Sequence, residues 1–203
     1  MQSLAPRWVL GGGFLLAHRI LLTADEVRRA VLRISHEITE RNPSSVSIAL
    51  IGIQTRGVFL AQRLAQHISG FSDTTVDIGS LDPRLYRDDP GRASSQVLLP
   101  TEVQFSVEGR TVVLVDDVLF TGRTIRAAMD ALNEFGRPSE VQLAVLIDRG
   151  HRQLPIRANF VGKNVPTNRE DNVSVLLHEM DGTDEVKVDG QTALNRLTNV
   201  RDK

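Results

Sequence analysis

Residues 112–124 read VVLVDDVLFTGRT, and this stretch decides the fold class of the chain. The segment from Thr111 to Val115, at the start of this stretch and one residue before it, predicts a buried strand, because a parallel strand covered on both faces is apolar without alternation. A helix is predicted from Arg123 to Phe135, with Gly136 and Pro138 ending it. A strand followed directly by a turn and a helix is the repeating unit of an open α/β sheet.

The same alternation continues on both sides of this unit. A first helix is predicted to begin at Thr23, which forms a capping box with Glu26, and to end near Asn42. The remaining predicted elements are strands at 46–53, 75–81 and 141–147, a helix at 58–68 and a long polar loop at 86–100. We therefore expect an α/β fold, with a central parallel sheet and helices on both faces.

Length and composition limit the classes of protein that fit. The 203 residues suit one domain, which we expect at 21–188, between an N-terminal extension at 1–20 and a C-terminal tail at 189–203. A net charge of -1 argues against a general nucleic-acid coat, and the absence of cysteine excludes disulfides and thiolate metal sites. No stretch has the pattern of a membrane span or a signal peptide, so we expect a cytoplasmic protein.

The stretch at 112–124 also predicts a ligand. Ligands of parallel sheets bind beyond the carboxyl ends of the strands, where we expect Asp116 and Asp117. Two carboxylates can accept hydrogen bonds from the vicinal hydroxyls of a ribose. The turn from Thr121 to Thr124 enters a helix, so its N–H groups can surround a phosphate. A ribose 5-phosphate fits both features.

Two other interpretations fit the stretch at 112–124 less well. Four apolar residues before two acids also resemble a Walker B strand, but the glycine-rich stretch from Gly52 to Gly57 is followed by Val58 instead of the lysine of a P-loop. A purely structural strand–turn–helix would need neither the acid pair nor the Thr-Gly-Arg-Thr order.

The stretch resembles the phosphoribosyl pyrophosphate (PRPP) signature of type I phosphoribosyltransferases. Over about residues 23–188 the chain resembles one family, the bifunctional pyr operon attenuation regulators and uracil phosphoribosyltransferases. The stretches that carry this resemblance are GIQTRG at 52–57, LYRDD at 85–89, GRP at 136–138, QLAVLIDRGH at 142–151, LPIR at 154–157 and VGKNVPT at 161–167.

The resemblance implies the type I fold with a small hood, and specific binding roles. Thr55, Arg56 and Arg87 would bind pyrophosphate, with Arg87 on a lid and a non-proline cis peptide common in the loop of Thr55. PRPP would contact Asp116, Asp117, Val118, Leu119, Phe120, Thr121, Gly122, Arg123 and Thr124. Uracil would contact Asp148, Arg149 and a hood containing Val161, Lys163 and Asn164. Mg²⁺ would be held mainly by the oxygens of PRPP, without a dedicated protein site.

The resemblance also implies binding to the leader of pyr messenger RNA, promoted by UMP or UTP, and a homo-oligomer. A basic surface could be formed by Arg29, Arg33, His36, Arg41, Arg152, Arg157 and Lys163. Leu32, Pro83 and Arg84 depart from the usual family residues. The alternatives that stay open are a nucleotide-sensing RNA regulator with weak catalysis and a purine phosphoribosyltransferase.

Overall fold

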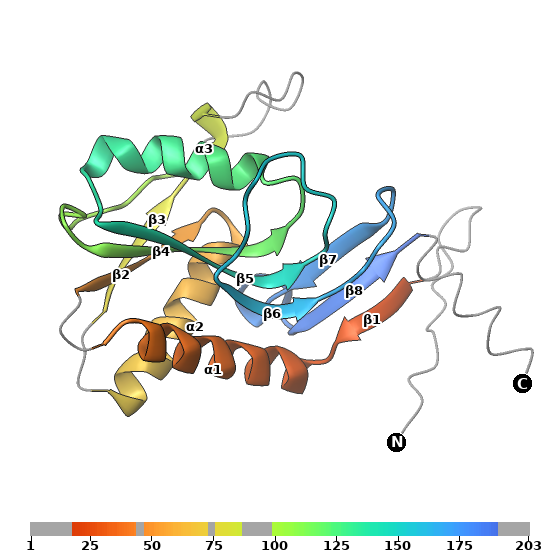
Figure 1. Ribbon diagram of the computed structural model, residues 1–203. Coiled ribbons are helices and arrows are strands. Elements are labelled where there is room, and N and C mark those ends of the chain that lie inside the picture. Colours follow the sequence, from red (N-terminus) through yellow and green to blue (C-terminus); the bar gives the residue numbers. More distant parts are fainter. Residues whose placement is uncertain (1–17, 44–46, 73–75, 87–98, 191–203) are drawn as a thin grey trace, which may run out of the picture. The chain divides into compact units, whose positions relative to one another are not determined.

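Five parallel strands form the central sheet of the computed structural model, which describes residues 18–43, 47–72, 76–86 and 99–190 (Figure 1). Their order across the sheet is β3-β2-β4-β5-β6, and every neighbouring pair is parallel. The strands are β2 (Ile48–Ile53), β3 (Asp77–Leu81), β4 (Thr111–Leu119), β5 (Glu140–Asp148) and β6 (Phe160–Asn164). The predicted α/β class is confirmed.

Helices cover both faces of this sheet. On one face, α1 (Ala24–Arg41) and α2 (Arg56–Phe71) bring Val31, Ile34, Leu60 and Leu64 against β4 and β5. On the other face, the core around Leu114 and Val145 is closed by α3 (Arg123–Leu132). Short 3-10 turns follow β3 and α3, at η1 (Pro83–Tyr86) and η2 (Asn133–Phe135).

The chain divides into two compact units. The larger is residues 29–164, which contain the central sheet. The smaller contains the described residues 18–28 and 165–190, where β1 (His18–Leu22), β8 (Glu185–Asp189) and β7 (Asn172–Leu176) form an antiparallel sheet in that order. The short helix α4 (His178–Asp181) lies between β7 and β8 in sequence.

Two boundaries differ from those expected. Residues 18–20 were assigned to an extension, but they belong to β1, where His18 pairs with Asp189 of β8. Residues 161–164 were expected in a hood, but they form most of β6 and extend the central sheet beside β5. Neither strand has the alternating or continuous apolar pattern by which strands are predicted, because each lies at a partly exposed edge.

Candidate active site at the carboxyl end of the sheet

The order of the strands places a topological switch point between β2 and β4. The chain leaves β2 toward β3 on one side, and β4 then returns to the opposite side of β2. Ligands of open α/β sheets bind at the carboxyl ends of the strands at such a point. Gln54 follows β2 directly, and the pairing of β2 with β4 ends at Val115, immediately before Asp116. The predicted pyrophosphate and ribose segments therefore meet at this position.

Two glycines allow this close approach. A Cβ atom at Gly57 would lie 2.2 Å from the carbonyl oxygen of Val115, and one at Gly52 would lie 2.4 Å from the Cα atom of Val58. The first turn of α2 thus packs directly on β4, where no side chain fits. The motif from Gly52 to Gly57 is explained by this contact between helix and strand.

The loop between β2 and α2 holds the predicted pyrophosphate residues. The peptide bond between Gln54 and Thr55 is cis, as the resemblance implies. Thr55 is exposed and occupies the N-cap of α2, and Arg56 is the first residue of that helix. The positive end of the helix and the guanidinium group both favour an anion at this place. Arg87 lies outside the described residues.

The acid pair is positioned more deeply than expected. We expected Asp116 and Asp117 at the end of the strand, but β4 continues to Leu119 because Val118 and Leu119 still pair with β5. Asp116 is buried, and its Oδ1 accepts the N–H of Asp117 at 2.9 Å. Burial raises the pKa of Asp117, while the Val118 N–H and the positive charge of Arg56 oppose that rise. Asp117 and Arg56 are thus electrostatic neighbours.

The turn from Phe120 to Thr124, where the sequence predicts a phosphate site, leads directly into α3. Gly122 is the N-cap of α3 with φ of 91°, a conformation that favours glycine. The Thr121 carbonyl accepts the N–H groups of Gln153 and Leu154, at 3.0 and 3.3 Å. With this carbonyl directed toward the segment after β5, the turn can present N–H groups to an anion at the start of α3.

The side chain of Arg152 holds the beginning of this turn by hydrogen bonds to its backbone. Its guanidinium group donates to the carbonyl oxygens of Leu119 and Phe120, at 3.3 and 2.7 Å, and to the carboxylate of Asp148. Our sequence interpretation placed Arg152 on an RNA surface, whereas the structure gives it these contacts within the larger unit. No local sequence signal distinguishes such an arginine from an exposed one.

The predicted base-binding residues lie at the ends of β5 and β6. The pairing of these strands brings Asn164 beside Asp148. The carboxylate of Asp148 accepts hydrogen bonds from the Gly150 N–H and from Arg152. Arg149 is buried, and its guanidinium carbon lies 4.1 Å from the centre of the Phe120 ring. The segment predicted to bind the base and the turn predicted to bind phosphate are therefore in contact through the side chains of Arg149 and Phe120.

Strand β6 also contacts a residue that was assigned to RNA. The guanidinium group of Arg33 donates to the carbonyl oxygens of Val161 and Gly162, at 3.0 and 2.6 Å, and forms an ion pair with Glu37. Gly162 is required there, because a Cβ atom would lie 2.4 Å from the Leu146 carbonyl oxygen. Arg33 thus holds β6, which lies at the edge of the predicted base site.

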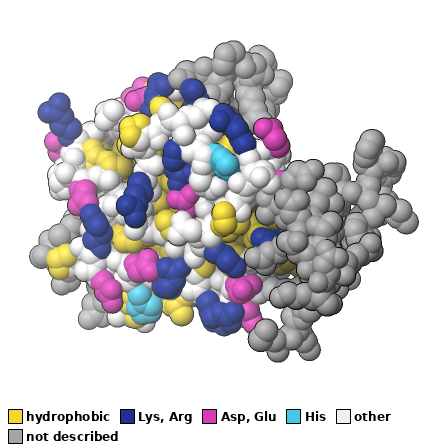
Figure 2. Space-filling model, turned by 45° about the vertical axis from the view of Figure 1, so that its right-hand side comes forward, with side chains coloured by type: hydrophobic (Ala, Val, Ile, Leu, Met, Phe, Trp, Pro, Cys, Tyr) yellow, Lys and Arg dark blue, Asp and Glu magenta, His cyan; other side chains and the backbone are white. Residues whose placement is uncertain are grey.

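The other predicted RNA residues differ in their surroundings. Arg29, Arg157 and Lys163 are exposed, Arg41 forms an ion pair with Glu140, and the ring of His36 stacks on Phe71 at 4.1 Å. On the face drawn in Figure 2, Lys and Arg side chains alternate with Asp and Glu side chains. Charge alone therefore does not mark an RNA surface there.

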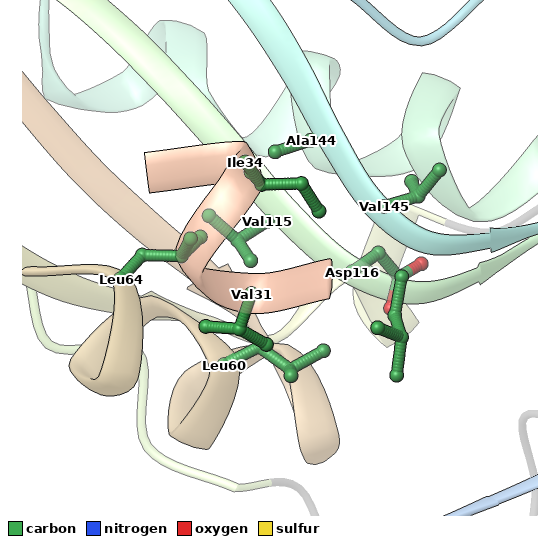
Figure 3. A pocket seen from close by; sticks show the side chains of 9 residues that line it. Val31, Ile34, Leu60, Leu64, Val115, Asp116, Ala144 and Val145 are labelled. Atoms are coloured by element: carbon green, nitrogen blue, oxygen red, sulfur yellow. The ribbon is translucent and has the colours of Figure 1, made fainter. Parts of the chain in front are cut away.

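A small pocket beneath the sheet belongs to the core (Figure 3). Aliphatic side chains of α1, α2, β4 and β5 line it, and Asp116 is its only charged neighbour. It lacks the donors that a phosphate needs, so we assign it to packing of the helices on the sheet.

Within the described part of the chain, no helix has the length and apolarity to cross a membrane.

Comparisons with known proteins agree with this geometry. Residues 10–179 match the phosphoribosyl transferase domain family. The bifunctional protein PyrR of Roseiflexus sp. is 56% identical over 168 residues, which are 82% of this chain and 92% of the relative. The chain belongs to the PyrR family. The PyrR protein of Chloroflexus aurantiacus is likewise 56% identical, over 83% of this chain and 93% of its own.

Solved structures support the fold of this PyrR family member. A hypoxanthine phosphoribosyltransferase of Trypanosoma cruzi matches with a TM-score of 0.64 and 19% identity, over 94% of this chain and all of that one. A hypoxanthine phosphoribosyltransferase of Staphylococcus aureus matches with a TM-score of 0.62 and 19% identity, over 83% of this chain and 90% of that one. At this identity the likeness shows the fold alone.

Proposed function

We propose that the chain transfers the phosphoribosyl group of PRPP to uracil, giving UMP and pyrophosphate. The observation that supports this most is the meeting of the acid pair, the phosphate turn before α3 and the Gln54–Thr55 loop at one switch point. These parts match the ribose, the 5-phosphate and the pyrophosphate of PRPP. The family name implies two activities, and the transferase domain supplies the first.

The reaction needs no protein nucleophile. The bond from C1 of the ribose to pyrophosphate breaks, N1 of uracil forms the new bond, and the N1 proton is released to water. Positive charge develops on the ribose as pyrophosphate leaves. Asp116 and Asp117 would hold the ribose hydroxyls and stabilise that charge, while Thr55 and Arg56 would stabilise the leaving group.

Mg²⁺ would accompany PRPP. Among the described residues, no three His, Cys, Asp or Glu side chains cluster as a metal site. A hard ion at a phosphate needs few protein ligands, so the oxygens of PRPP would supply most of its coordination. The ion would neutralise part of the charge on pyrophosphate as it leaves.

The identity of the base is tested by measuring label transfer from radioactive uracil, hypoxanthine and orotate in separate reactions with PRPP and Mg²⁺. We expect UMP from uracil and no product from the other two bases. Product from hypoxanthine would instead identify a purine enzyme. UMP binding without turnover of any base would identify a nucleotide-sensing regulator.

We propose binding of the pyr messenger RNA leader as the second activity. The proposed contacts share an exposed position and are Arg29, Arg33, His36, Arg41, Arg157 and Lys163. UMP or UTP would promote this binding, and the protein would act as a homo-oligomer in the cytoplasm. Support comes from the family and from the exposure of these six residues. Sedimentation of a monomer at working concentration would contradict the oligomer.

Arg157→Ala is expected to weaken binding of the leader RNA about tenfold, because one phosphate contact is lost. The slope of log affinity against log salt concentration should fall by about 1. Filter binding at several salt concentrations measures both quantities. The matched control is Arg126→Ala, which removes an arginine that pairs with Asp130 on α3. Equal losses in both variants would show a general charge effect.

A further inference from the structure

Asp82 is a buried carboxylate that the roles above leave without a function. It follows β3 directly, and the pairing of Ile53 with Leu81 places it beside Gln54 at the carboxyl edge of the sheet. Its side chain is only 4% exposed. A charge in such a place is costly unless it is paired and hydrogen-bonded, so its partners indicate what it holds.

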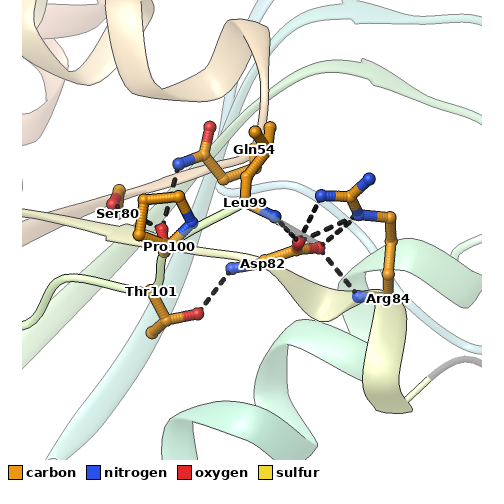
Figure 4. Close-up of polar contacts among 7 residues, drawn as sticks. All are labelled: Gln54, Ser80, Asp82, Arg84, Leu99, Pro100 and Thr101. Carbon is orange, nitrogen blue, oxygen red and sulfur yellow. Dashed lines mark hydrogen bonds and ion pairs between the residues drawn. The ribbon is translucent and has the colours of Figure 1, made fainter. Parts of the chain in front are cut away.

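The carboxylate of Asp82 accepts hydrogen bonds from two separate segments (Figure 4). The Arg84 side chain donates through Nε, at 2.8 and 2.9 Å to the two oxygens, and through Nη2, and its backbone N–H donates at 3.1 Å. The N–H of Leu99 donates at 2.8 Å. Burial would raise the pKa of Asp82, but the bonds from Arg84 and Leu99 hold it below its ordinary value. The carboxylate therefore joins the residues after β3 to residue 99.

The segment that begins at Leu99 is in turn bonded to the pyrophosphate loop. The Asp82 N–H donates to Oγ1 of Thr101 at 3.0 Å. Pro100 lies between Leu99 and Thr101, which are both hydrogen-bonded to Asp82. Its carbonyl oxygen accepts hydrogen bonds from Nε2 of Gln54 at 3.2 Å and from the hydroxyl of Ser80 at 3.4 Å. Gln54 also donates its N–H to the Leu81 carbonyl at 2.9 Å. Gln54 is the first half of the cis peptide that presents Thr55.

Asp82 also fixes the short turn η1, which follows β3. Arg84 belongs to η1, which ends at Tyr86. Glu134 raises the pKa of the Tyr86 hydroxyl, and the Tyr86 ring packs on the core cluster that includes residues of α3. The turn is thus held at Arg84 by Asp82 and at Tyr86 by the α3 side.

We propose that Asp82 is a positioning residue for pyrophosphate: it holds the Gln54–Thr55 loop in the arrangement that binds the leaving group of PRPP. It touches neither the substrate nor the base site. The inference rests on the proposed transferase function. It assigns to one side chain a selective effect on the pyrophosphate part of the site, which a merely structural residue would not have.

The test is Asp82→Asn, which keeps the size of the side chain and removes its charge. We expect the KM for PRPP and the inhibition constant of pyrophosphate to rise about tenfold, the effect of losing one hydrogen bond to a charged group. The KM for uracil and the dissociation constant of UMP, which lacks pyrophosphate, should change less than about twofold. Steady-state kinetics with product inhibition and calorimetry of UMP binding give these values.

The matched control is Asp77→Asn, at the opposite end of β3, where the carboxylate pairs with Arg110 at 2.7 Å and is half exposed. It should leave all four constants unchanged. If Asp82→Asn does not fold, Arg84→Lys decides, because lysine keeps the charge but cannot bridge both carboxylate oxygens. The proposal is overturned if the KM for PRPP does not change, or if the KM for PRPP and the dissociation constant of UMP rise by the same factor. An inactive wild-type protein would instead contradict the proposed function.

Discussion

Asp117→Asn is expected to lower kcat/KM for PRPP about 100-fold, or roughly 2.7 kcal/mol of transition-state stabilisation. The carboxylate would hold a ribose hydroxyl and face the positive charge that develops as pyrophosphate leaves. Asparagine keeps the shape and one acceptor oxygen, but it removes the negative charge. The loss should therefore appear in kcat as well as in the KM for PRPP, and initial rates with saturating uracil measure both.

The same substitution should leave the folded protein at least as stable. Burial raises the pKa of Asp117 above its ordinary value of 3.8, so the charged form is disfavoured in the folded state. Wild-type stability therefore falls as the pH rises from about 3.8 through that raised pKa, and asparagine avoids this loss. The stability difference between variant and wild type should grow over that range and then stay constant.

Urea unfolding at several pH values tests this difference. Asp130→Asn is the control, because Asp130 is exposed on α3 and pairs with Arg126 at 3.2 Å. It changes the net charge equally and should alter neither turnover nor the pH dependence of stability. An unchanged rate for Asp117→Asn would remove this carboxylate from the site. A slower variant that is also much less stable would show that Asp117 is needed for folding.

Much of the fold was predictable because local patterns determine it. The capping box of α1 is present, with the Thr23 N–H 2.9 Å from the Glu26 carboxylate. The end of the helical segment at Gly136 follows from a φ of 128°, which favours glycine. The expected strand at 111–115 was too short, because polar Asp116 and Asp117 interrupt the apolar run while their backbone still pairs with β5.

The edges of the sheets were not predictable in the same way. Only one of the five residues of β6, Phe160, is buried, so the pattern of this strand does not separate it from a loop. Its place depends on Gly162, which fits against the Leu146 carbonyl, and on the bonds from Arg33. Contacts between residues so far apart in sequence leave no signal in a single chain.

The residues of the candidate site also differ in whether a local pattern or a distant contact determines them. Residues that belong to a local motif, such as Asp117 and Gly122, could be proposed as binding residues from the order of residues alone. Residues that act through distant partners could not: no local pattern distinguishes Arg152 from an exposed arginine, and none marks Asp82. Their roles arise from carbonyl and N–H groups brought together by the parallel register of the strands.

Gly57→Ala is expected to have the largest combined effect on stability and activity. The added methyl group would lie 2.2 Å from the Val115 carbonyl oxygen and 3.3 Å from the Cα atom of Asp116, so backbone must move. Overpacking of this kind costs about 1–3 kcal/mol of unfolding free energy. The start of α2 must also shift relative to Asp117, and a displacement of about 1 Å at such a site can cost about 100-fold in rate.

The control lies on the same helix. A Cβ atom at Gly70 meets nothing within 4 Å, so Gly70→Ala introduces no clash. Alanine is favoured over glycine within a helix by about 1 kcal/mol, although the effect is smaller near the helix end. Gly70→Ala should therefore be neutral or stabilising and fully active, while Gly57→Ala is less stable and nearly inactive. Thermal unfolding and the uracil assay compare the two variants. Equal behaviour would mean that the contact between α2 and β4 does not determine the geometry of the pyrophosphate loop.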